Sequence, residues 1–333
     1  MRRFSLAFLT ISSCVFVSSL LLLGCGGKKD DDDDAPRTPK TKRGAGAVVG
    51  PTLKKKVEAK EYGTLNGKVE FLGDPATVAG DPKAVLTTIS ANTDRDFCLT
   101  GKKAGEVSPI PIHDYETTQQ EYRIGKNKGL GNVFVWIEPQ EGYYFDIPAD
   151  QLAAVEKEVL ITQPHCNFLP HCTVLFPYYF KDGIQAKTGQ KLIIENDALV
   201  LHNAKISGEK NNPLNVGIPA RKGDTVSKET HTFRPEKNPV TIGCNVHGWM
   251  KGYVRVHSHP YAAVTSVGAD LKDPKNRVWE NASSDAYGTY TIKGVPVGAT
   301  VKLFAWHEKL EWLTKASGDD LVVTKDTKAN FPK

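Results

Sequence analysis

The stretch Gly243-Cys244-Asn245-Val246-His247-Gly248-Trp249-Met250 decides how we interpret this chain. It lies between two runs, residues 240–242 and 253–256, in which apolar and polar side chains roughly alternate. Alternation with a period of two is typical of β-strands, so the stretch is predicted to be a loop joining two strands. Its spacing, C-x2-H-x2-M, lets a thiolate, an imidazole and a thioether converge from one short loop, and all three are ligands for transition metals.

A second imidazole lies about forty residues upstream, where His202 and Asn203 follow an apolar run. Two histidines and one cysteine in a plane, with a weak axial methionine, are the ligands of a mononuclear blue-copper site. The alternative is a buried cysteine, an exposed histidine and a core methionine with no metal between them. The metal interpretation is favoured because Met250 is the only methionine besides Met1 and it occupies the axial position.

These residues resemble the cupredoxin family, in particular its short-loop members of the amicyanin and plastocyanin kind. The resemblance implies copper as the cofactor and a hydrogen bond from Asn203 that holds the two ligand segments together. It also implies that the loop histidine presents its ring edge at the surface. The ligands that the resemblance implies are His202, Cys244, His247 and Met250.

Short alternating runs separated by Gly, Pro and Asn-Asp clusters predict an all-β protein, a sandwich or a barrel. With the resemblance, we expect a cupredoxin-like Greek-key β-sandwich over residues 61–258 and a small β-sandwich-like extension over 259–333. Residues 73–130 are an expected insertion with no readable periodicity, and one short helix is expected within 149–157. The tail resembles the carboxypeptidase-regulatory-like β domains that follow such cupredoxins.

The N-terminus predicts export. Arg2 and Arg3 precede an apolar run that ends in Leu-Leu-Gly-Cys, which resembles a bacterial lipobox. Residues 1–24 are then a lipoprotein signal peptide, Cys25 carries the lipid that anchors the chain to a membrane, and residues 25–60 form a disordered tether. A plain membrane helix is the alternative, since about twenty apolar residues can span a bilayer.

Three cysteines remain after Cys25 and Cys244 have been assigned, an odd number for an oxidising compartment. We predict a Cys98–Cys166 disulfide that ties the insertion to the β-framework, with Cys166–Cys172 as the second choice. A further metal site at the His-Cys pairs 165–166 and 171–172 is a weaker possibility.

The expected function is a membrane-tethered periplasmic or cell-surface electron carrier with a protein redox partner and no enzymatic activity. A net charge of only +5 argues against a nucleic-acid partner. One alternative is a copper enzyme, which needs a second copper site that the remaining histidines do not obviously form. The other is a structural surface module, metal-free or copper-binding, whose β domain binds carbohydrate or protein.

The sequence leaves two roles open for Trp249, which is either a contact for the partner or a core residue. The remaining histidines considered are His113, His231, His257 and His259.

Overall fold

Strands dominate the part of the chain that the computed structural model describes, which is residues 54–78, 82–118, 121–269 and 280–332. The predicted all-β class is therefore confirmed. The expected signal peptide, the lipidated Cys25 and residues 26–53 lie outside the described residues. Among the described residues, no helix is long and apolar enough to cross a membrane.

Two sheets surround the predicted metal loop. The larger has the order β13-β12-β15-β16-β8, with bounds Leu214–Ile218, His202–Ser207, Val240–Gly243, Lys251–Val256 and Cys172–Leu175. The smaller has the order β14-β11-β7, with bounds Ser227–His231, Lys191–Asn196 and Glu158–Thr162. Apolar side chains of both sheets, such as Leu192 and Val240, share one buried cluster, so the sheets are two layers of a sandwich.

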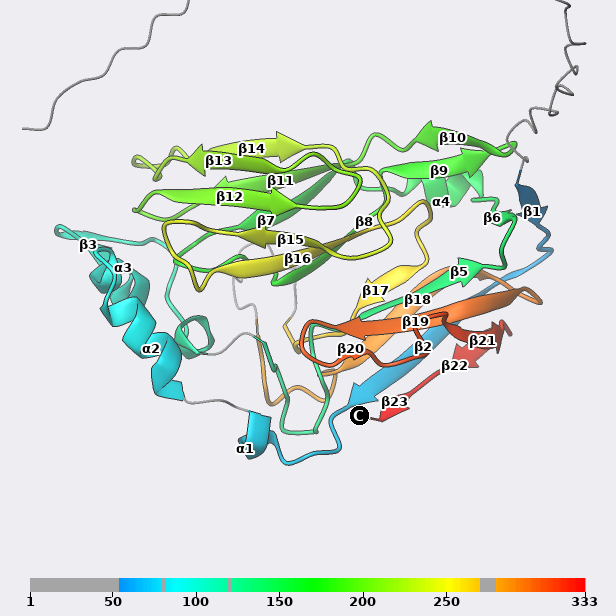
Figure 1. The fold of residues 1–333 in the computed structure, drawn as a ribbon, viewed down its shortest axis with the longest axis horizontal. Helices are drawn as coiled ribbons and strands as arrows, with labels where there is room; N and C mark the ends of the chain where they lie inside the picture. Colours follow the sequence, from blue (N-terminus) through cyan, green and yellow to red (C-terminus); the bar gives the residue numbers. More distant parts are fainter. Residues whose placement is uncertain (1–53, 79–81, 119–120, 270–279, 333) are drawn as a thin grey trace, which may run out of the picture. The chain divides into compact units, whose positions relative to one another are not determined.

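A second pair of sheets combines early and late parts of the chain (Figure 1). One has the order β17-β5-β19-β20 with β21 beside β19, and bounds Ala262–Val264, Phe134–Pro139, Thr300–His307, Glu311–Trp312 and Asp319–Val322. The other has the order β18-β2-β22 with β23 also on β2, and bounds Thr289–Pro296, Tyr62–Glu70, Asp326–Lys328 and Phe331–Pro332. Their apolar faces share a second buried cluster.

The strand pairing crosses the boundary expected at residue 258. Strands β2 and β5, assigned from the sequence to the first domain, form ladders with β18 and β19 of the expected extension. The extension therefore completes its sheets with strands that precede the sandwich around the predicted metal loop in the chain. The division into domains stays a prediction, since the described residues all belong to one compact unit, 51–333.

Strand β5 contacts both sandwiches, because its successive side chains point to opposite faces. Val135 and Ile137 point into the cluster of the second sandwich. Phe134 and Trp136, on the other face, pack with Cys172 of β8. Successive side chains of a strand point to opposite faces, so a strand buried on both sides reads as the continuous apolar run seen here.

The insertion is partly helical. It contains α1 (Pro75–Val78), α2 (Pro82–Ser90), α3 (Arg95–Thr100), the hairpin β3 (Lys102–Lys103) and β4 (Glu106–Val107), and the 3-10 turn η1 (Asp114–Thr117). Ile89 of α2 and Phe97 of α3 belong to the core of the metal-loop sandwich. In Figure 1, these helices lie beside the end of the sandwich where β15 turns into β16.

Two short elements refine the predictions. The expected tether is too long at its C-terminal end, because β1 (Lys55–Val57) pairs in parallel with β6 (Tyr143–Phe145) and Val57 packs against the core. The expected helix within 149–157 is present as α4 (Ala149–Ala153). A separate hairpin of β9 (Tyr178–Lys181) and β10 (Ile184–Lys187) completes the strands.

Candidate metal centre

The C-x2-H-x2-M segment is the tight loop between β15 and β16. Its ends are tied by a hydrogen bond from the Cys244 N–H to the Met250 carbonyl, 3.3 Å, and the Met250 N–H donates to the His247 carbonyl over 2.9 Å. The His247 N–H also points at Cys244 Sγ, 3.4 Å away. This folding brings the Cys244 sulfur to 4.0 Å from Nδ1 of His247.

His202 begins the neighbouring strand β12 and meets the loop from the other side. Its Nδ1 lies 2.9 Å from Nδ1 of His247, and the potential ligand atoms of His202, Cys244 and His247 all lie within 4.8 Å of one another. The side chains of all three residues are buried. The structure therefore brings together three of the four ligands expected from the sequence.

The tautomer of His202 is fixed by its second nitrogen. Nε2 lies 2.6 Å from the backbone carbonyl of His165, which can only accept, so Nε2 carries the proton. In the neutral ring, Nδ1 then holds a lone pair that points at His247 and Cys244. Burial and the neighbouring His247 lower the pKa of His202 to about 3, so the ring is neutral near pH 7. A neutral imidazole held by a second hydrogen bond is the form that binds a metal ion.

Asn203 links the two ligand segments. Its Oδ1 accepts a hydrogen bond of 2.6 Å from the Asn245 N–H, and it lies 3.2 Å from Cys244 Sγ. Its Nδ2 donates to Oδ1 of Asn215 on β13 over 2.6 Å. Asn203 thus connects the loop to two strands of the larger sheet, as the resemblance implied.

Met250, the fourth expected ligand, is buried in the same apolar cluster as Cys244. A thioether in an apolar setting can serve as a weak axial ligand. This donor set fits copper, because thiolate and thioether suit Cu(I) while imidazole is acceptable to both oxidation states.

The expectation that the loop histidine is exposed is wrong for this structure. The His247 side chain is 0% exposed. Asp94, at the start of α3, places Oδ2 3.3 Å from its Nε2, and Asn92 donates to the Val246 carbonyl over 3.1 Å. The insertion, which the resemblance does not cover, therefore closes over this edge of the loop.

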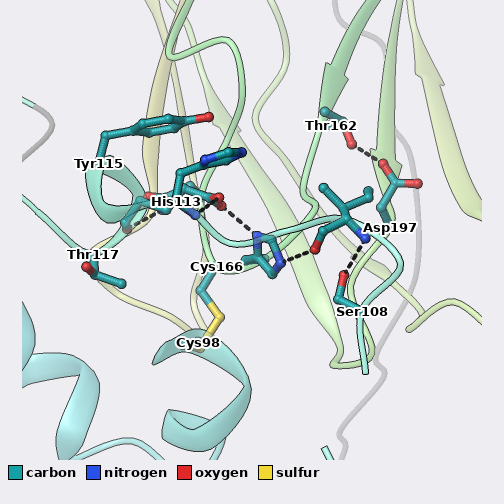
Figure 2. Close-up of polar contacts among 12 residues, drawn as sticks. Cys98, Ser108, His113, Tyr115, Thr117, Thr162, Cys166 and Asp197 are labelled. Atoms are coloured by element: carbon teal, nitrogen blue, oxygen red, sulfur yellow. Dashed lines mark hydrogen bonds and ion pairs between the residues drawn. A yellow bond between two sulfur atoms is a disulfide. The ribbon is translucent and has the colours of Figure 1, made fainter. Parts of the chain in front are cut away.

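A disulfide fastens the insertion in this position. Cys98 of α3 and Cys166 form the pairing predicted from the sequence, shown in Figure 2. Both sulfurs lie within 4.8 Å of a ring nitrogen of His247. Nearby, the buried Glu116 carboxylate lies 2.7 Å from Nδ1 of His165, whose Nε2 lies 3.1 Å from the Ile110 carbonyl. These contacts hold the insertion against the segment that also orients His202.

Burial lowers the pKa of His247, although the Asp94 carboxylate acts in the opposite direction. Among the described residues, that carboxylate is the only acidic group within ion-pair distance of His247, and the Lys103 ammonium lies 3.8 Å from its other oxygen. Sequence reasoning missed Asp94 because it lies in the insertion, where no periodicity or motif marked it.

Trp249 packs beside the metal loop, and its contact with a partner stays a prediction. Its Nε1 donates to the Cys166 carbonyl over 3.1 Å, and its ring meets His247 edge-on with 5.2 Å between ring centres. It also lines a cavity of about 210 Å³ together with Gly248 and the buried pair His171–Glu308, whose Nε2 and Oε1 are 2.5 Å apart. Trp249 is therefore half-buried, between the metal loop and this cavity.

The remaining cysteines and histidines have separate surroundings in the structure. The pairs 165–166 and 171–172 do not form a metal site, since Cys166 is in the disulfide and the two histidines are held by Glu116 and Glu308. Cys172 is a buried thiol whose pKa burial raises, and it contacts the Asn132 carbonyl. His257 and His259, which formed no obvious set in the sequence, converge with Glu138 in the structure.

No protein-family model matches this chain, and no curated protein matches it. Among solved structures, amicyanin from Paracoccus versutus is 15% identical and aligns over 34% of this chain and 86% of its own, with a TM-score of 0.22. A purple cupredoxin from Nitrosopumilus maritimus is 19% identical and aligns over 30% of this chain and 99% of its own, with a TM-score of 0.22. Because these TM-scores are low, the ligand set is inferred from the geometry of this chain alone.

Proposed function

We propose that this chain is an exported, membrane-tethered carrier of single electrons that binds one copper ion through His202, Cys244, His247 and Met250. The observation that carries the proposal is the convergence of two Nδ1 atoms, 2.9 Å apart, on the sulfur of a buried cysteine. Copper bound by such a set can accept and release one electron, because the ligands suit both of its oxidation states.

The surrounding residues keep the ligands in place. The His165 carbonyl fixes the tautomer of His202, and Asn203 fixes the loop that carries Cys244. The ligands pack in the core between two sheets, and a disulfide holds the insertion beside them. A rigid set of this kind changes little when the charge at its centre changes, which favours fast electron exchange.

Burial of the ligands supports a carrier rather than an enzyme. The side chains of His202 and His247 have no exposed surface, and Cys244 is almost fully buried. A substrate would need an open position beside the ligands, whereas an electron can leave through the protein. The proposed partner is therefore a redox protein, and none of the proposed site residues is catalytic.

Export and anchoring rest on separate observations. A Cys98–Cys166 disulfide is expected only in an oxidising compartment, which agrees with the lipobox-like sequence before Cys25. We propose that the mature chain begins at Cys25 and is held at a bacterial membrane, on its periplasmic or outer side, by lipid on that residue.

Copper titration of residues 36–333 tests the proposed site. Cu(II) should give an intense visible band from thiolate-to-metal charge transfer, and Cys244→Ser should abolish it. Met250→Leu should keep the band and change the reduction potential, since the axial ligand is a weak contact. Cys172→Ser is the matched control, because Cys172 is the other buried free thiol in the part of the chain that the structure describes. A folded protein that stays colourless, or that loses its colour equally in the control, would refute the proposal.

A further inference from the structure

A second cluster of potential ligands lies at the end of β16 that is remote from the metal loop. His257 follows β16 directly and His259 comes two residues later, and the centres of the two rings lie 5.1 Å apart. Glu138 reaches them from β5. The potential ligand atoms of Glu138, His257 and His259 all lie within 4.8 Å of one another.

The spacing of these atoms matches ligands that share one ion. Nε2 of His259 lies 3.2 Å from Oε2 of Glu138, and Nδ1 of His257 lies 3.7 Å from Oε1. The second distance is too long for a hydrogen bond. Two ligand atoms, each about 2.1 Å from a metal ion at a tetrahedral angle, are separated by about 3.4 Å, which lies between the two values.

The hydrogen bonding of His257 is incomplete. Its side chain is 2% exposed, and its Nε2 has no hydrogen-bond partner among the residues that the structure describes. Its ring packs 5.7 Å from that of Trp136, and the His259 ring meets Phe145 edge-on at 5.2 Å. These aromatic contacts, together with the 3.2 Å hydrogen bond between His259 Nε2 and Glu138 Oε2, orient both imidazoles toward Glu138.

The cluster is accessible from solvent. The Glu138 side chain is 36% exposed and, with His257, lines a cavity of about 290 Å³. The Arg255 guanidinium is near, but it is held over the Trp136 ring at 4.4 Å and donates to the Glu236 carbonyl. An ion entering from the cavity would thus find three ligands and keep one position open.

We propose that Glu138, His257 and His259 bind a divalent transition-metal ion, distinct from the copper site. Two imidazoles and one carboxylate are a ligand set that Zn²⁺ accepts, with a fourth position left to water. In the metal-free chain, the Tyr261 N–H donates to Nδ1 of His259 over 3.3 Å. Binding through Nε2 moves the ring proton to Nδ1 and gives up two hydrogen bonds, this long one and the 3.2 Å bond between Nε2 and Oε2 of Glu138, in exchange for two bonds to the metal ion.

Zinc binding to the disulfide-intact folded chain, measured by equilibrium dialysis and elemental analysis, tests the site. His257→Gln and His259→Gln should each remove one zinc equivalent per chain or weaken it at least tenfold. His231→Gln, a partly buried histidine on β14, is the control and should leave that equivalent unchanged. Cys244→Ser should also leave it unchanged, so failure of the copper site and failure of this site are distinguishable.

Thermal melting provides a second test in case a histidine variant does not fold. Zinc should raise the melting temperature of the wild-type chain and of Cys244→Ser, and Glu138→Gln, which keeps the shape of the side chain, should abolish the rise. Zinc binding that is unaffected by all three substitutions, or reduced equally by His231→Gln, would overturn the proposal.

Discussion

Asp94 provides a direct test of how the insertion acts on the proposed copper site. Its Oδ2 lies 3.3 Å from Nε2 of His247, while Nδ1 of the same ring faces Cys244 and His202. Asp94→Asn keeps the shape of the side chain and an oxygen close to Nε2. The substitution therefore removes one negative charge with little change in packing.

The expected shift follows from Coulomb's law. Adding the width of the ring and one metal–nitrogen bond to 3.3 Å puts the carboxylate about 7 Å from the metal position. At an effective dielectric constant of about 20 to 40, one unit charge at that distance contributes about 1–2 kcal/mol. This corresponds to about 50–100 mV for one electron. The lower end is favoured, because the Lys103 ammonium lies 3.8 Å from Asp94 and offsets part of its charge.

The sign is fixed as well. The carboxylate stabilises Cu(II) more than Cu(I), so its removal should raise the reduction potential, as measured by spectroelectrochemistry on the copper-loaded protein. Asp96→Asn is the matched control, since Asp96 lies two residues further along the same helix with its side chain 86% exposed. A potential that falls, or that rises no more than in the control, would refute the proposed electrostatic role of Asp94.

Four further predictions address the disulfide, the partner, acid stability and the anchor. Replacing Cys98 and Cys166 together by alanine removes a cross-link between residues 68 positions apart. Urea unfolding should show that the free energy of unfolding falls by about 4 kcal/mol. A decrease near zero would argue against a stabilising role of the disulfide. Trp249→Ala should keep the visible band but slow electron exchange with a protein partner. In stopped-flow measurements, the rate with a small inorganic acceptor should fall less than the rate with the protein partner. Equal rates of wild type and variant with the protein partner would exclude Trp249 from the docking surface. Metal-free protein should lose stability as pH falls below about 6.5 toward 3, since the unfolded chain protonates His202 first, and this residue contributes a slope of about 1.4 kcal/mol per pH unit. Thermal melts check this, and His202→Gln should reduce the slope by that amount and leave the part due to the buried His257 and His307. Cys25→Ser should release the protein from membranes in fractionation, and unchanged partitioning with the same mature mass would count against lipidation.

The proximity of Cys244 and His247 was predictable because its signal is local. Cys244, His247 and Met250 lie within seven residues, and the alternating runs on either side show that a short loop joins two strands. His202 required one further inference, that a histidine at the start of another strand reaches the same loop. The hydrogen bonds of the structure then supply what spacing could not, namely which nitrogen of His202 is free.

The insertion and the sheet pairing were not predictable in the same way. Helices α1, α2 and α3 span four, nine and six residues, too short to establish a helical period in the sequence. The β2–β18 ladder joins segments more than two hundred residues apart, such as Leu65 and Ile292. Both strands alternate clearly, but alternation identifies a strand and not its neighbour.

Ligands and covering residues therefore come from different parts of the chain and should respond differently to substitution. The ligands belong to β12 and the β15–β16 loop, whose positions follow from the hydrogen-bond ladders of one sheet. Asp94 and Cys98 belong to the insertion, which reaches the loop through a disulfide, a few hydrogen bonds and apolar packing. Substituting a ligand should remove the metal, whereas substituting Asp94 should leave it bound and change its potential. If Asp94→Asn instead lost copper in the way Cys244→Ser is expected to, the carboxylate would be needed to hold His247 in place, and the insertion would be part of the metal-binding framework.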